Sequence, residues 1–81
     1  MVRLVFLGKL ADLAGAGAMD IKGTETLKWE SLLAMLASDL AHALQGDKVR
    51  VALNGEVLPD KTALVAAPGS EVAFFPPVSG G

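Results

Sequence analysis

The residues best suited to chemistry are the last two, Gly80 and Gly81, which follow the run Phe-Phe-Pro-Pro-Val-Ser. A C-terminal carboxylate on glycine can enter a narrow active site that a larger side chain would block. A carboxylate is a poor electrophile, and its simplest activation is adenylation with ATP. The adenylate can then react with a sulfur donor to leave a thiocarboxylate, or with an amine to leave an amide. The sequence therefore indicates Gly81 as the reactive residue.

Two prolines predict how this end of the chain is presented. The rings of Pro76 and Pro77 fix φ near about −65° and favour an extended polyproline conformation. Fully extended, residues 76–81 reach about 20 Å from the fold. We expect residues 1–75 to form one domain and residues 76–81 to form a flexible tail.

Composition argues against most other reactive chemistry. The 81-residue chain has no cysteine and one histidine, so we expect no disulfide, iron–sulfur cluster, bound metal or catalytic triad. The net charge is −2, and the seven basic residues are spread from Arg3 to Lys61, which gives no basic patch for nucleic acid. No apolar run approaches the roughly 20 residues that span a bilayer, and no signal-peptide core is visible, so we expect a cytoplasmic protein without membrane contact.

Several segments have the composition and alternation of β-strands. They are residues 2–7, 19–22, 48–53, 56–58 and 72–75. Asn54-Gly55, between two of these segments, is a strong signal for a tight hairpin turn.

One amphipathic helix is predicted over residues 29–44, after a single helical turn at residues 9–13. Residues 23–26 supply possible N-terminal caps, and Gly46 is placed to end the helix in a left-handed conformation. A helix of this kind covers one face of a mixed sheet of about five strands, an α+β domain. The element order matches the β-grasp, or ubiquitin-like, arrangement, in which the first and last strands pair at the centre of the sheet. The apolar stripe of the helix consists of Trp29, Leu32, Leu33, Leu36, Leu40 and Leu44.

The stretch Glu71–Gly81 resembles the C-terminal signature of the molybdopterin synthase small subunit, a sulfur-carrier family related to the thiazole-synthesis carrier and to ubiquitin. The Phe-Phe-Pro-Pro-Val-Ser-Gly-Gly part is the specific one, while Val2–Gly8 and Leu53–Gly55 are similar but less distinctive. The resemblance covers the whole chain in length and element order. The chain departs from the family at Ala11-Asp12, where Arg-Glu is frequent, and at Gly69–Glu71, where Gly-Asp-Glu is usual.

The resemblance implies a reaction cycle in which this chain is not catalytic alone. An adenylating enzyme of the ubiquitin-activating type would consume ATP to adenylate Gly81, and a sulfurtransferase system would convert the adenylate into a thiocarboxylate. The tail would then insert into the large subunit of molybdopterin synthase. There, sulfur would pass to cyclic pyranopterin monophosphate during molybdenum cofactor biosynthesis. The family also implies a heterotetramer of two large and two small subunits, and no permanently bound cofactor.

Strand alternation predicts a surface for the partner. If Phe74 faces the helix, Phe75 lies on the opposite face of the sheet, and polar Arg3 marks that face as the outer one. Val5 and Leu7 would then join Phe75 in an exposed apolar patch. The alternative is that Phe75 folds back onto its own domain. With the tail, the expected partner-binding residues are Val5, Leu7, Phe75, Pro76, Pro77, Val78 and Ser79.

Other functions stay open on the sequence alone. The same carrier chemistry could serve thiazole synthesis or tRNA thiolation, although Pro76-Pro77 favours the pterin pathway. The chain could instead be a ubiquitin-like modifier joined to lysines through Gly81. It could also be a β-grasp interaction domain with an inert tail, for which deletion of Gly81 would be harmless.

Overall fold

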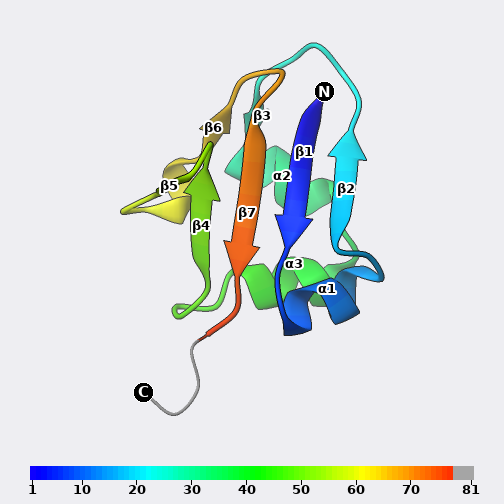
Figure 1. Ribbon diagram of the computed structural model, residues 1–81, viewed down its shortest axis with the longest axis vertical. Coiled ribbons are helices and arrows are strands. Elements are labelled where there is room, and N and C mark those ends of the chain that lie inside the picture. Colours follow the sequence, from blue (N-terminus) through cyan, green and yellow to red (C-terminus); the bar gives the residue numbers. More distant parts are fainter. Residues whose placement is uncertain (78–81) are drawn as a thin grey trace.

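A computed structural model describes residues 1–77 and shows a mixed sheet with helices on one face (Figure 1). None of the helices in this part of the chain is long and apolar enough to cross a membrane. The elements, in chain order, are β1 (Val2–Phe6), α1 (Lys9–Ala14), β2 (Ala18–Ile21), β3 (Leu27–Lys28), α2 (Trp29–Met35), α3 (Ser38–Leu44), β4 (Arg50–Leu53), β5 (Glu56–Val57), a 3₁₀ turn (Lys61–Ala63), β6 (Val65–Ala66) and β7 (Glu71–Phe75).

The first and last strands pair at the centre of the main sheet. The strand order is β2-β1-β7-β4-β5, and β1 runs parallel to β7. The other neighbouring pairs of this sheet are antiparallel. The sequence-based prediction that the first and last strands are neighbours is therefore confirmed.

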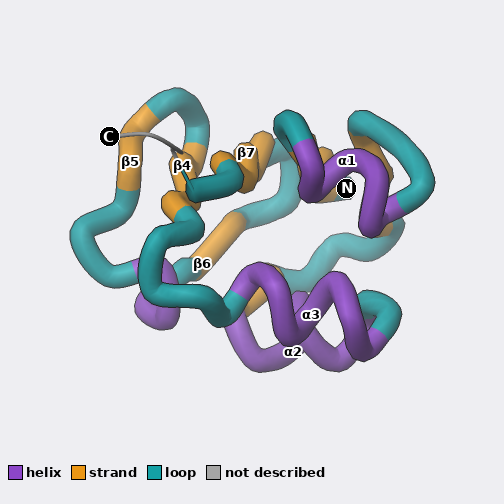
Figure 2. The backbone as a smooth tube through the Cα atoms, turned by 90° about the horizontal axis from the view of Figure 1, so that it is seen from below, coloured by secondary structure: helices purple, strands orange, loops and turns teal. Residues whose placement is uncertain are grey.

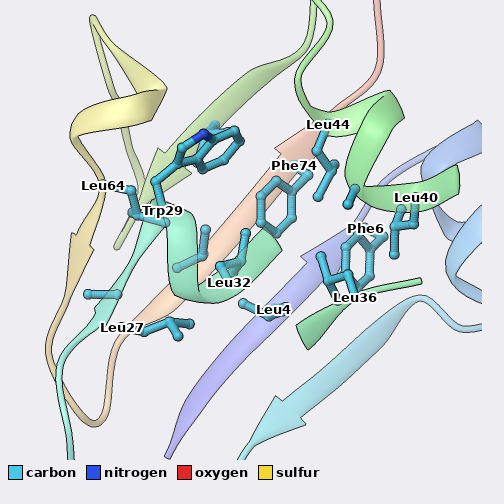
Figure 3. Packing of buried hydrophobic residues seen from close by; sticks show 14 of the residues in the cluster. Leu4, Phe6, Leu27, Trp29, Leu32, Leu36, Leu40, Leu44, Leu64 and Phe74 are labelled. Carbon is cyan, nitrogen blue, oxygen red and sulfur yellow. The ribbon is translucent and has the colours of Figure 1, made fainter. Parts of the chain in front are cut away.

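The hydrophobic core lies between this sheet and the helices (Figure 3). Side chains alternate along β1 and β7, so that Leu4, Val72 and Phe74 are wholly buried at 0% exposure. The rings of Phe6 and Phe74 stack with their centroids 5.2 Å apart. Seen from below, α2 and α3 form a second layer against one face of the strands (Figure 2). The helices contribute the predicted stripe to the core, with Trp29, Leu32, Leu36, Leu40 and Leu44 all buried.

The prediction of one continuous helix over residues 29–44 is wrong. α2 ends at Met35 and α3 begins at Ser38. Between them, Leu36 and Ala37 are extended, with ψ of 157° and 145°. The apolar stripe continues across the break in the helix, so its periodicity gave no sign of the interruption.

Polar residues explain where the helix breaks. Serine and aspartate compete with the helix by bonding to nearby backbone groups, so they favour helix starts over helix interiors. The Asp39 carboxylate accepts a hydrogen bond from the Leu40 backbone N–H at 2.9 Å, within the first turn of α3. Leu36 and Leu40, on either side of the break, are both buried, so the break does not expose the apolar stripe.

Both predicted helix caps differ from the structure. α2 starts directly from strand β3, with extended Lys28 at its N-cap and no capping side chain, so residues 23–26 do not cap it. The short strand pair β3–β6, whose strand β3 directly precedes the first residue of α2, was not predicted. α3 ends through Gln45 in a right-handed conformation, and Gly46 is not among the residues with positive φ. The end is a tight turn in which the Gly46 N–H donates to the Ala43 carbonyl at 3.1 Å.

The predicted β4–β5 hairpin is confirmed. Asn54 and Gly55 both have positive φ, at 49° and 87°, as the favoured two-residue hairpin turn requires. The Asn54 side chain also accepts a hydrogen bond from the Glu71 N–H at 2.9 Å and donates one to Ser70 Oγ at 3.4 Å. The hairpin is therefore tied to the start of β7.

Two adjacent phenylalanines provide a matched test of which side of β7 is buried. Phe74→Ala should lower the free energy of unfolding by about 3–5 kcal/mol, because its ring is wholly buried against Phe6. Phe75→Ala should cost far less, since Phe75 is only half-buried. Urea unfolding followed by Trp29 fluorescence measures both changes, and equal losses would contradict the assigned faces.

Candidate functional site

The outer face of the sheet carries a flat apolar row. In the strand register, Ala18, Val5, Ala73, Ala52 and Val57 lie side by side across all five strands. Residues paired in this way point to the same face. That face is the one that α2 and α3 leave uncovered (Figure 2). We call these residues the apolar row.

A charged row borders the apolar row toward the N-terminus of β1. Arg3 lies between Asp20 on β2 and Glu71 on β7. Its Nε donates to Asp20 Oδ1 at 3.2 Å, and both side chains are exposed. Because an exposed ion pair contributes at most about 1 kcal/mol, its main effect is to give this end of the outer face a polar boundary.

Phe75 lies at the opposite border, beside the start of the tail. It is half-buried and sits opposite Arg50 in the β4–β7 register. A shallow groove of about 550 Å³ is lined by Phe75, Pro76, Val57, Lys48 and Arg50. We call it the Phe75 groove.

The predicted orientation of the outer face is confirmed. Val5 belongs to the apolar row and is half-buried, and Leu7, one residue beyond β1, is 37% exposed. Phe75 does not fold into the core, whereas Phe74 does. The binding roles of Val5, Leu7 and Phe75 stay predictions.

The prolines end the strand pairing at the root of the tail. The Leu7 N–H still donates to the Phe74 carbonyl at 3.1 Å. Pro76 and Pro77 have no N–H to continue a ladder with either neighbour of β7, so the chain leaves the sheet there. Pro76 is half-buried and Pro77 is exposed. The remaining predicted site residues, Val78, Ser79, Gly80 and Gly81, lie outside the described residues.

A glycine beside the tail leaves room for Pro76. Gly8 has φ 55° and ψ −131°, in a turn closed by the Leu10 N–H donating to the Leu7 carbonyl at 3.1 Å. A Cβ at Gly8 would lie 3.0 Å from Pro76 Cγ, closer than side chains normally approach. Gly8 thus both permits this backbone conformation and accommodates the first residue of the tail.

Lys61 holds the turn that leads into β4, a role that no sequence pattern indicated. Its amine donates to the backbone carbonyls of Gly46 and Val49, the latter at 3.1 Å. Burial lowers the pKa of Lys61, while the nearby Asp47 carboxylate acts in the opposite direction. A single lysine in a loop has no distinguishing spacing, so only the three-dimensional contact reveals this function.

Within residues 1–77, no group of three or more His, Cys, Asp or Glu side chains is arranged to hold a metal ion. The features that the structure does bring together are an apolar outer face, a groove with two cations and the root of a tail that leaves the sheet centre. This combination on a sheet with paired first and last strands defines a small ubiquitin-like β-grasp protein. The chain belongs to the ThiS family, which it matches over residues 4–81.

Known proteins agree with this assignment. The chain is 33% identical, over 85 aligned residues that span all of both chains, to the molybdopterin synthase sulfur carrier subunit of Haemophilus influenzae. It resembles the crystal structure of SAMP1 from Haloferax volcanii with a TM-score of 0.65 and 29% identity, covering 99% of this chain and 98% of the other. It also resembles a chain in the complex of subunits 1 and 2 of molybdopterin-converting factor from Helicobacter pylori, with a TM-score of 0.63 and coverage of 99% and 97%. At 21% identity, this last likeness concerns the fold alone.

Substitution of Gly8 should disturb the root of the tail. We expect Gly8→Ala to lower the free energy of unfolding by about 1–3 kcal/mol, because alanine strains the positive φ and its Cβ meets Pro76. Gly15→Ala is a control for positive φ alone, because Gly15 has ψ 7° rather than −131° and nothing lies within 4 Å of an added Cβ. Urea unfolding compares the two variants. A loss as large in Gly15→Ala would show that neither the contact with Pro76 nor the ψ of Gly8 adds to the cost.

Proposed function

We propose that this chain is the sulfur carrier subunit of a molybdopterin synthase. The observation that carries the proposal is its full-length 33% identity to the Haemophilus influenzae carrier subunit, together with a family match that extends through Gly81. The arrangement around β7 supports it, because the tail leaves from the centre of the sheet and an apolar face surrounds its root.

In this proposal, Gly81 carries the sulfur. Its carboxylate attacks the α-phosphate of ATP, pyrophosphate leaves, and an acyl adenylate forms. A sulfur donor then displaces AMP and leaves a thiocarboxylate. Both steps belong to partners, an adenylating enzyme of the ubiquitin-activating type and a sulfurtransferase system. This chain supplies the carboxylate and has no cysteine that could hold sulfur as a persulfide.

The folded part of the chain positions the tail for delivery. β7 is hydrogen-bonded to β1 on one side and to β4 on the other, so the tail starts from a fixed point. Pro76 and Pro77 prevent the tail from continuing along the sheet. The tail then inserts into the large subunit of the synthase, where Gly80 and Gly81 approach cyclic pyranopterin monophosphate and donate the sulfur. Phe75, Val5 and Leu7 contact the large subunit around the point of insertion.

The sulfur-carrying role of Gly81 can be measured by intact mass. Incubation with the adenylating enzyme, ATP and a sulfur donor should exchange one carboxyl oxygen of Gly81 for sulfur. Deletion of Gly81 should abolish the product without unfolding the domain, whereas Met35→Ala, an exposed substitution on α2, should keep it. An unmodified wild-type chain under these conditions would contradict the proposal.

Phe75 should contribute to binding of the large subunit more than to folding. Burying its ring in a partner contributes about 1.5–3 kcal/mol, so Phe75→Ala should weaken the affinity by about tenfold or more. Met35→Ala is a suitable control, because Met35 is a 57% exposed apolar side chain on α2, away from the outer face. Calorimetric titration measures both affinities. An unchanged affinity for Phe75→Ala would show that Phe75 does not contribute to the interface.

A second candidate is a ubiquitin-like modifier joined to lysines through Gly81. The 29% identity to SAMP1, a small archaeal modifier protein, favours this reading. Covalent adducts in cell extract that disappear on deletion of Gly81 would support it. Complementation of cells that lack pterin, thiazole or tRNA-thiolation pathways would distinguish the pterin carrier from carriers with other acceptors.

A further inference from the structure

We infer that the Phe75 groove receives an acidic side chain of the large synthase subunit, held between Lys48 and Arg50. This inference rests on the proposed function and specifies the chemistry of the partner at that site. It adds charge recognition to the apolar contact of Phe75.

The groove has a charge opposite to that of the whole chain. The net charge is −2, yet Lys48 and Arg50 on the rim are both cationic and exposed. Within residues 1–77, the one ion pair joins Arg3 to Asp20, on the far side of the apolar row. No carboxylate among the described residues therefore neutralises Lys48 or Arg50 at ion-pair distance.

The nearest acidic residues along the chain do not line the groove. Asp47 lines a neighbouring cavity that Arg50 and Lys61 also border, and it makes no ion pair with Arg50. Glu56 pairs with Leu53, and by alternation it points to the opposite face of the sheet from Val57, which lines the groove. The positive charge of the rim is thus available to an anion from outside the chain.

The fold fixes the backbone positions of the two cations. Arg50 sits directly opposite Phe75 in the register of β4 and β7, so its side chain starts beside the ring. Lys48 belongs to the turn between α3 and β4, which Lys61 anchors at the carbonyls of Gly46 and Val49. A partner carboxylate would therefore meet two cations whose backbone positions are already set by the fold.

The lining of the groove identifies the kind of occupant. Three of its lining residues, Phe75, Pro76 and Val57, are apolar, and the other two, Lys48 and Arg50, are cationic. This fits an apolar side chain next to an aspartate or glutamate better than it fits a free phosphate, which would leave the apolar lining unused. The groove also adjoins the root of the tail, so a protein that takes up the tail must cover it.

Charge reversal tests the inference through association kinetics. Lys48→Glu and Arg50→Glu should each slow association with the large subunit by about tenfold at low salt, and the difference should shrink as salt rises. Lys28→Glu is the matched control, because it changes the net charge equally at an exposed position on β3. It should have little effect. Thermal unfolding verifies that all three variants remain folded.

Zero-length cross-linking tests the contact directly. A carbodiimide activates a partner carboxylate, the Lys48 amine attacks it, and an amide bond forms as the urea leaves. Mass spectrometry should find Lys48 joined to an aspartate or glutamate of the large subunit. Lys48→Arg keeps the positive charge but removes the amine, so it should bind normally and give no such cross-link.

The outcomes separate this inference from the proposed function. If the wild-type chain does not bind the large subunit, the proposed function fails and the inference fails with it. If the wild-type chain binds while Lys48→Glu and Arg50→Glu leave the association rate unchanged, only the inference about the groove is overturned. The same holds if Lys28→Glu slows association as much as they do. Cross-links from Lys48 to a second copy of this chain alone would also overturn it, and would assign the groove to self-association.

Discussion

The parallel pairing of β1 with β7 is the constraint on which the rest of the structure depends. It brings the two ends of the described chain to the centre of one sheet, where each strand has a neighbour on both sides. Its inner face contributes Leu4, Phe6 and Phe74 to the core, and α2 and α3 pack against that face. The tail therefore starts from a strand that is hydrogen-bonded on both sides, so its root has a fixed position relative to the outer face.

Alternation along β7 places two neighbouring phenylalanines in different surroundings. Phe74 stacks on Phe6 inside the core, while Phe75 lines a groove on the outside. Since the two side chains point to opposite faces, the outer one can change without leaving a cavity in the core. Pro76 then ends the hydrogen-bonded ladder, because it has no N–H to donate. Phe74, Phe75 and Pro76 thus lie in the core, on the outer face and at the root of the tail, respectively.

Features with a short sequence period were predictable, and features set by tertiary contacts were not. Alternation was enough to place Phe74 inside and Phe75 outside, and Asn54-Gly55 was enough to predict the hairpin. The break after Met35 was not predicted, because the leucine spacing continues across it. The anchoring contact of Lys61 was also missed, because it joins residues far apart in the sequence through backbone carbonyls.

The absence of side chains at Gly80 and Gly81 has a consequence for partner choice. A glycine tail suits a narrow active site, but it offers an enzyme only backbone groups to recognise. If Phe75 binds a partner as we propose, it adds affinity without strong discrimination, since one apolar contact differs little from another in free energy. Discrimination between partners therefore has to come from the folded surface at the root of the tail. In our proposal, Lys48 and Arg50 of the Phe75 groove, which have no ion-pair partner within residues 1–77, provide this discrimination through their charge and position.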